Sequence, residues 1–352
     1  MEGSSRRHDI DWLRVIAIAI LIIYHATVSF QPWALEIAFI QSKESIEWLW
    51  IPMELVNIWR IPLLFFVSGM GVCFAMRKRN WQDLFLERLR RIFVPLIFGV
   101  FVIVPLYLFV LQAYYKNLLM DYLPHPGHLW FLGNIMAYVI LCLPLFYFIK
   151  GRPDNAFIRL LKSLLKAPLG LVLVGTPFII EAVVIAPKYF SMYAGTLHGF
   201  FIGLIAFFFG YCFVFIGDVF FQLVNKYKFL LLVAAFILYL NRLISYGLFG
   251  APLWLISVES MLWLYVVFGF SYRYLNRPSR LLSNLSPAVY PVYIVHMFFQ
   301  YLVSTLFLEV EISTQLQLLG IISTTLLLSW ISYDLVIRRI KYLRPLFGLN
   351  FK

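Results

Sequence analysis

The feature that most constrains this chain is a succession of apolar runs, each long enough to cross a lipid bilayer as a helix. A membrane-spanning helix needs about 20 mostly apolar residues. Such segments cover roughly residues 12–31, 56–76, 91–112, 128–149, 168–187, 198–216, 228–248, 252–272, 288–308 and 315–337. Prolines, glycines, asparagines and charged residues separate them. The sequence therefore predicts an all-α, polytopic membrane bundle of about ten transmembrane helices, forming a single domain over residues 1–352.

The composition agrees with a membrane protein. Hydrophobic residues make up 62% of the 352 residues and charged residues only 13%, whereas about a quarter of a soluble domain is charged. The three cysteines, Cys73, Cys142 and Cys212, each lie inside an apolar run, which favours small buried side chains over disulfides or metal ligands. No small-residue cleavage site follows the first apolar run, so we expect a retained helix rather than a signal peptide.

The distribution of basic residues predicts the orientation. With the N-terminus placed inside, 23 of the 29 Lys and Arg residues fall in inner segments, and three, Lys43, Lys116 and Lys188, fall in outer loops. This bias follows the positive-inside rule and predicts that both termini are cytoplasmic. The formal net charge of +12 is then explained by orientation and anionic lipid, and no nucleic-acid partner is expected. We predict a multi-pass protein of the cell (inner) membrane.

The first helix carries two ionisable side chains, which are costly inside a membrane and favour a function. Arg14 and His25 are eleven residues apart, close to three helical turns, so they share one face. Asp11 lies three residues before Arg14 and can pair with it. Two structural explanations stay open: Arg14 as an interfacial arginine that extends to water, and His25 as a core histidine bonded to a neighbouring helix.

The second helix carries Arg60 at a depth similar to that of His25, and Pro62 leaves a nearby backbone carbonyl without its helical hydrogen bond. Further along, Ser68 and Gly69 are followed by Gly71. Small residues of this kind either contribute to a site or only let another helix approach closely.

Other polar groups lie in or beside the predicted spans. The fourth helix begins with His128 at the outer rim and Trp130, which is either a site residue or an interfacial anchor. The ninth contains Tyr293 and His296 near mid-membrane. Glu259 in the eighth helix and Arg242 at the end of the seventh flank a short turn, so we expect a buried pair.

The predicted inner loop before the third helix is strongly basic. Arg88 and Arg91 are three residues apart and can contact phosphate groups together. Anchoring by the positive-inside rule explains the same residues equally simply.

These groups form two polar zones that suggest acyl transfer. The outer zone contains His25, Arg60, His128, Glu259 and Arg242, and the inner zone contains Arg14, Arg88 and Arg91. A donor with phosphates would bind at the inner zone, and an acceptor hydroxyl would lose its proton to His25. Arg60 or His128 would stabilise the developing oxyanion.

The first two helices resemble those of the acyltransferase-3 family of integral membrane O-acyltransferases. The hallmark of that family is an arginine and a histidine separated by ten residues on the first helix, here Arg14 and His25. Its arginine followed by Ser-Gly on the second helix is similar to Arg60, Ser68 and Gly69.

Three further motifs extend the resemblance over the whole chain. Arg88 and Arg91 resemble the Arg-x-x-Arg of the family, and His128–Leu132 resembles its His-Leu-Trp-Phe-Leu. Tyr293 and His296 resemble its Tyr-x-x-His. Within the family, the chain is most similar to the glucan-biosynthesis protein C branch, which is associated with succinylation of periplasmic glucans.

The resemblance implies an acyl-CoA donor on the cytoplasmic side, a carbohydrate hydroxyl as the extracytoplasmic acceptor, and no bound cofactor or metal. His25 would be the general base or a transient acyl carrier. The acyl group would be succinyl or acetyl, and an oligomer is compatible with the sequence. The main alternative is a transporter or flippase whose path is lined by the same polar residues, and a structural or sensory membrane protein is a third.

Overall fold

The computed structural model describes residues 6–116 and 120–351, and every regular element in these ranges is a helix. The chain forms two compact units. Unit 1 comprises Met1–Arg14, Glu54–Phe85 and Ala137–Leu282, and unit 2 comprises Val15–Met53, Leu86–Met136 and Ser283–Lys352. Each unit is described by itself.

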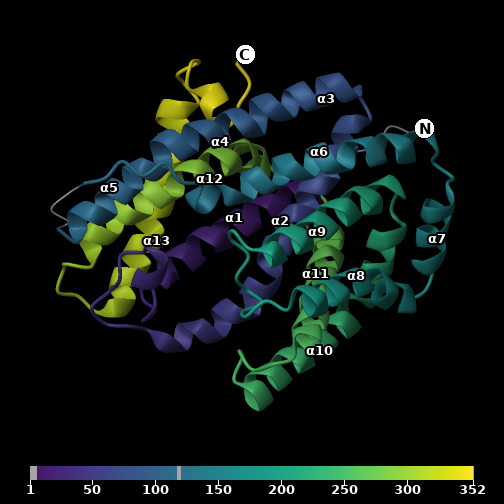
Figure 1. Cartoon of the computed structure of the whole chain (residues 1–352), viewed down its shortest axis with the longest axis horizontal. Helices are drawn as coiled ribbons and strands as arrows, with labels where there is room; N and C mark the ends of the chain where they lie inside the picture. Colours follow the sequence, from purple (N-terminus) through teal and green to yellow (C-terminus); the bar gives the residue numbers. More distant parts are fainter. Residues whose placement is uncertain (1–5, 117–119, 352) are drawn as a thin grey trace. The chain divides into compact units, whose positions relative to one another are not determined.

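The α-helices α1 to α13 (Figure 1) are His8–Val28, Trp50–Met76, Trp81–Arg88, Val94–Phe98, Val104–Tyr114, Trp130–Gly151, Ala156–Leu164, Leu169–Ile185, Leu197–Phe215, Val219–Tyr246, Leu253–Tyr274, Arg280–Phe307 and Thr314–Ile331. The short 3-10 helices are η1 (Leu35–Ile37), η2 (Glu47–Leu49), η5 (Gly127–Leu129) and η7 (Arg344–Phe347). The π-helical segments are η3 (Leu89–Phe93), η4 (Gly99–Ile103) and η6 (Ser332–Ile337).

Within the described ranges, nine helical segments are long and apolar enough to cross a membrane. A tenth is added if α7 and α8, which meet at 120°, form one broken span. This confirms the predicted all-α membrane bundle of about ten transmembrane helices. The sidedness of the termini stays a prediction from the basic residues.

The ends of several helices differ from the predicted limits. α10 begins at Val219 rather than near residue 228, and α12 begins at Arg280 rather than near residue 288. The residues before the predicted starts include Lys226 in one case and Arg280 and Pro287 in the other, with several further polar side chains, so hydropathy alone excludes them. Helical hydrogen bonding nevertheless continues through charged residues beyond the apolar stretch, and membrane helices tolerate proline.

Unit 1 is built around α8, α9, α10 and α11, in which α10 packs along α11, α11 against α8, and α8 against α9 (Figure 1). Phe66 of α2 stacks on Phe178 and Phe213 in its core. A Cβ atom at Gly69 would collide with the carbonyl oxygen of Phe207, and one at Gly210 with that of Phe66. These contacts show that Gly69 is needed for close packing of α2 on α9.

Unit 2 contains α4, α5, α13, and most of α1 and α12. Its C-terminal η7 packs against η3 and α4, where the rings of Phe98 and Phe347 lie 5.4 Å apart. Pro105 has no N–H for the carbonyl of Phe101, and the hydroxyl of Tyr122 donates to that carbonyl at 2.7 Å.

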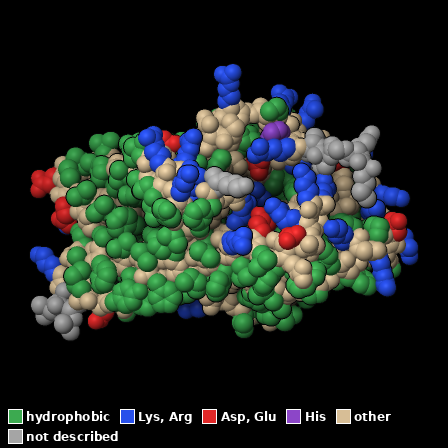
Figure 2. Space-filling model, turned by 90° about the horizontal axis from the view of Figure 1, so that it is seen from above, with side chains coloured by type: hydrophobic (Ala, Val, Ile, Leu, Met, Phe, Trp, Pro, Cys, Tyr) green, Lys and Arg blue, Asp and Glu red, His purple; other side chains and the backbone are tan. Residues whose placement is uncertain are grey.

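Large apolar side chains are exposed along the spanning helices. Examples are Val184 of α8, Ile244 of α10 and Leu319 of α13. Figure 2 shows hydrophobic side chains over much of the visible surface, with Lys and Arg side chains gathered on part of it. An apolar surface of this extent fits contact with lipid.

Candidate active site

Three histidines from distant parts of the sequence lie together in unit 2. His25 comes from α1, His128 from η5 and His296 from α12. The Nδ1 atom of His25 lies 3.0 Å from the Nε2 atom of His296, and the two rings are nearly parallel at 6°. The ring of His128 stands at 85° to that of His296, with centroids 5.1 Å apart. We call these residues, together with Tyr293, the histidine cluster.

The partners of His296 fix where its proton lies. Its Nδ1 atom is 2.6 Å from the carbonyl oxygen of Tyr293. Because a carbonyl only accepts hydrogen bonds, this Nδ1 carries the hydrogen. In neutral His296 the Nε2 atom therefore accepts a hydrogen bond from the Nδ1–H of His25. The basic nitrogen of neutral His25 is then Nε2, which is the proton acceptor that general-base catalysis requires.

His128 is held in place through its backbone and its ring. Gly127 precedes it with a φ of +49°, and a Cβ atom there would collide with the hydroxyl of Tyr107. The hydroxyl of Tyr293 donates to the carbonyl oxygen of His128 at 2.5 Å. The Nε2 atom of His128 lies 3.2 Å from the carbonyl oxygen of Ile294, so it is the donor. His128 would have to be protonated to donate from Nδ1 to an oxyanion.

Two buried polar atoms around the cluster have no hydrogen-bond partner among the described residues. They are Nδ1 of His128 and Oε1 of Gln300. The amide of Gln300 donates to the carbonyl oxygen of His25 at 2.7 Å, which places it beside the cluster. Buried polar atoms without partners are costly and call for an explanation, and a polar substrate or water supplies one.

The predicted donor-binding residues Arg88 and Arg91 also lie in unit 2. Glu87 is close to both, 3.8 Å from Arg88 and 3.3 Å from Arg91. Arg91 also donates to Asn350 at 3.2 Å. One carboxylate beside two guanidinium groups leaves a net positive charge, which suits a phosphate-bearing ligand.

Arg14 is the last residue of unit 1, whereas the three histidines belong to unit 2. The predicted pair with Asp11 is confirmed at 3.5 Å, and the guanidinium also donates to the carbonyl oxygen of Val67 at 3.4 Å. A Cβ atom at Gly71 would lie 2.7 Å from Nη2 of Arg14. Gly71 has no side chain, which leaves room for the Arg14 guanidinium. The hydroxyl of Ser68 donates to the carbonyl oxygen of Leu64 in its own helix.

Arg60 belongs to a second group of buried residues, which lies entirely in unit 1. It donates to Asn57 at 3.1 Å, and Asn57 donates to Glu54 at 3.3 Å. The predicted pair of Arg242 and Glu259 is confirmed, with two contacts of 2.7 and 3.1 Å. Glu54 lies 3.5 Å from Arg242. We call these five residues the charged network.

Glu54 was not identified from the sequence. It lies outside the predicted second helix, which begins near residue 56, whereas α2 begins at Trp50. Glu54, Asn57 and Arg60 recur every three residues, a spacing that would have placed them along one face of a longer helix.

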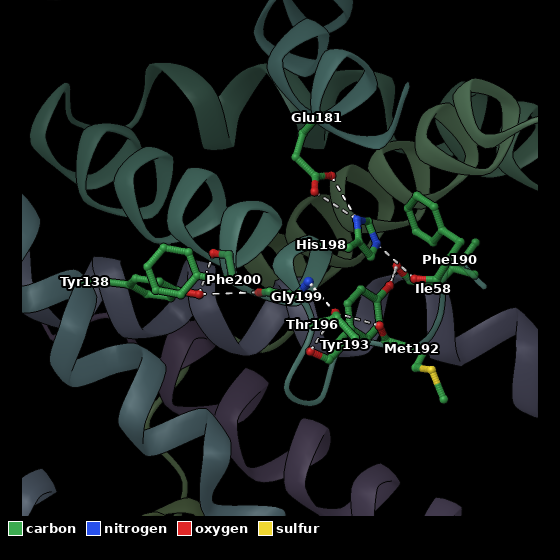
Figure 3. A network of polar contacts seen from close by, with 10 residues as sticks. All are labelled: Ile58, Tyr138, Glu181, Phe190, Met192, Tyr193, Thr196, His198, Gly199 and Phe200. Carbon is green, nitrogen blue, oxygen red and sulfur yellow. Dashed lines mark hydrogen bonds and ion pairs between the residues drawn. The ribbon is translucent and has the colours of Figure 1, made fainter. Parts of the chain in front are cut away.

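His198 anchors a loop in unit 1 (Figure 3). Its Nδ1 atom contacts both carboxylate oxygens of Glu181, at 2.9 and 3.0 Å, and its Nε2 donates to the carbonyl oxygen of Phe190 at 3.0 Å. Both ring nitrogens are occupied, so His198 holds α8, α9 and the loop between them.

The carbonyl left without a helical partner by Pro62 belongs to Ile58. The hydroxyls of Tyr193 and Ser260 both donate to it at 2.8 Å. The first of these contacts is visible in Figure 3. The expected gap in the hydrogen bonding of α2 is therefore closed within unit 1.

The remaining predicted site residue, Trp130, begins α6 in unit 2, and its ring lies 6.4 Å from that of Phe131. Although three histidines meet in the histidine cluster, no group of His, Cys, Asp and Glu residues in the described ranges is arranged to hold a metal ion.

Comparison with known proteins identifies the family. The sequence profile of an acyltransferase domain matches residues 7–334, which is nearly the whole chain. No curated protein and no solved structure matches the chain. The matched range includes the histidine cluster, Arg88 and Arg91. The chain therefore belongs to the acyltransferase-3 family and is a multi-pass membrane acyltransferase.

Proposed function

We propose that this protein transfers an acyl group from cytoplasmic acyl-CoA to a hydroxyl of an extracytoplasmic glycan, with His25 as the general base. The observation that carries the proposal is the 3.0 Å contact between His25 and His296, combined with the 2.6 Å contact of His296 with the carbonyl of Tyr293. This chain of contacts places the lone pair of neutral His25 on Nε2 and holds the ring in one orientation.

In the proposed reaction, Nε2 of His25 removes the proton of the acceptor hydroxyl while the oxygen attacks the thioester carbonyl. The tetrahedral intermediate collapses to the ester, and the CoA thiolate leaves and takes up the proton from His25. The imidazolium formed in between keeps its Nδ1–H directed at Nε2 of His296. In the alternative order of steps, Nε2 of His25 attacks the thioester first and carries the acyl group until the acceptor hydroxyl takes it.

The roles of the arginines rest on the motif resemblance and on charge. Arg88 and Arg91 would bind the phosphates of the donor, since guanidinium groups match phosphate oxygens in pairs. Arg14 is proposed to assist donor binding and Arg60 to stabilise the oxyanion. Succinyl or acetyl is the proposed acyl group and an extracytoplasmic glycan the proposed acceptor. The resemblance of the motifs to the glucan-biosynthesis protein C branch favours succinyl and a periplasmic glucan.

The direct test compares His25→Gln with wild-type protein reconstituted in nanodiscs and supplied with labelled acyl-CoA and glycan. Loss of the general base is expected to lower the transfer rate by about 10²- to 10⁴-fold. His8→Gln, at the start of the same helix, is the matched control and should retain activity. Undiminished transfer by folded His25→Gln would refute the base assignment.

Two further measurements separate the remaining alternatives. Trapping of labelled acyl groups on His25 in the absence of acceptor would show that His25 carries the acyl group during the reaction. Mass spectrometry of surface glycans with and without the protein would identify the acyl group. Unmodified glycans, together with movement of a labelled substrate across vesicles, would favour the transporter alternative.

A further inference from the structure

The C-terminal end of unit 2 contains a pocket that the proposed transfer does not use. It has a volume of about 510 Å³ and is lined by Asp334, Arg338, Arg339 and Arg344. It lies where the last spanning segment, α13 continued by η6, ends and the chain turns toward η7. We call it the arginine pocket.

Two of its arginines are held by the backbone of the same segment. Nε of Arg339 donates to the carbonyl oxygen of Asp334 at 3.2 Å, and Nε of Arg344 donates to that of Arg338 at 2.9 Å. Each guanidinium is thus fixed through Nε, while its two Nη groups remain as donors. A preorganised pair of this kind loses little side-chain entropy when it binds an anion.

The charges of the pocket are not balanced. Its single carboxylate, Asp334, pairs with Arg338 at 2.8 Å. Arg339 and Arg344 have no carboxylate partner among the residues that the structure describes. The lining therefore keeps two uncompensated positive charges, which fit one phosphate group in charge and in donor geometry.

The side chains next to the pocket indicate where that phosphate comes from. Leu335, Val336 and Ile340 are exposed, and Tyr342 is 81% exposed. Apolar and aromatic side chains beside arginines, at the end of a spanning helix, are typical of the boundary between lipid tails and headgroups. Basic pockets in this position bind anionic lipid headgroups.

We propose that the arginine pocket binds the phosphate of an anionic phospholipid headgroup, with the acyl chains lying along Leu335, Val336 and Ile340. The proposal does not depend on the chemistry at His25. A phosphate of the acyl donor is the competing ligand with the same chemistry, and the experiment separates the two.

The test uses full-length protein in phosphatidylcholine nanodiscs that contain a small fraction of phosphatidylglycerol. Lipids that remain bound are counted by native mass spectrometry. For Arg339→Gln/Arg344→Gln we expect phosphatidylglycerol affinity to fall roughly thirty-fold, since each basic residue near the surface contributes a factor of about five to six. Arg152→Gln/Arg277→Gln removes the same charge from exposed arginines in unit 1 and should change the affinity little.

A parallel titration with soluble CoA distinguishes the donor. The proposal expects the pocket variant to bind CoA like the wild type. Loss of CoA binding with phosphatidylglycerol binding intact would overturn it in favour of the donor phosphates. Equal retention of phosphatidylglycerol and phosphatidylcholine by wild-type protein, or undiminished phosphatidylglycerol binding by the variant, would also overturn it.

Discussion

The histidine cluster of unit 2 and the charged network of unit 1 both contain buried polar groups, but these groups differ in their partners. In the charged network, Arg242 is fully buried and contacts two carboxylates and two backbone carbonyls. In the histidine cluster, the contacts run between rings and backbone carbonyls, and Nδ1 of His128 has no partner among the described residues. A buried cation matched by carboxylates belongs to the fold, since losing either partner is strongly destabilising, whereas spare hydrogen-bonding capacity is what a substrate requires.

The largest effect is expected at Arg242. Arg242→Met would leave Glu259 and Glu54 buried without their cation, and breaking such a pair costs about 3–5 kcal/mol. We therefore expect loss of folded protein, measured by size-exclusion chromatography and thermal unfolding in detergent. The double variant Arg242→Met/Glu259→Leu, which removes charge from both sides, should recover much of the stability. A fully stable Arg242→Met would show that the network does not hold unit 1.

The second prediction concerns His296, which we propose as a positioning residue for His25. His296→Leu removes the acceptor of the His25 Nδ1–H, and a hydrogen bond to a charged group contributes about 1.5–3 kcal/mol. Turnover should therefore fall about 10- to 150-fold, while KM for acyl-CoA stays the same. Steady-state kinetics in nanodiscs measures both.

His198→Leu is the matched control, because His198 is also buried and has both ring nitrogens occupied. We expect it to lower the temperature of unfolding and to leave the turnover of the remaining folded protein unchanged. If His296→Leu instead lowered stability alone, the histidine cluster would be structural like the pair of Arg242 and Glu259.

The sequence predicted the helices far better than the contacts between them. A run of about 20 apolar residues is a strong signal, because every backbone polar group must be satisfied inside a bilayer. The motif on α1 identified His25, but nothing in the sequence placed His296 beside it, 271 residues away. Periodicity within a helix gives the face of a residue, whereas pairing between helices depends on packing over the whole unit.

The error at Glu54 has a similar physical origin. The predicted second helix begins near residue 56, whereas α2 begins at Trp50 and runs through Pro52 and Glu54, since proline is tolerated in the first turn of a helix. Glu54 therefore falls outside the predicted helix. In contrast, the pair of Arg242 and Glu259 was predictable, since a short turn joins their helices and few charges lay nearby.

The smallest predicted effect distinguishes two buried tyrosines with the same kind of hydrogen bond. The hydroxyl of Tyr293 donates to the carbonyl of His128 in the histidine cluster, and that of Tyr138 donates to the carbonyl of Phe200 in unit 1. Replacing either by Phe removes one hydrogen bond, which costs about 1 kcal/mol of stability. We expect both variants to unfold at slightly lower temperature.

Only Tyr293→Phe should also affect catalysis, because its hydroxyl holds the backbone of His128 while its own carbonyl continues to orient His296. We expect turnover to fall by roughly two- to tenfold, because one hydrogen bond that positions His128 contributes about 1 kcal/mol. Turnover of Tyr138→Phe, measured per folded molecule, should match the wild type. Equal turnover in both variants would mean that the position of His128 does not matter to the reaction, and would restrict the catalytic part of the cluster to His25 and His296.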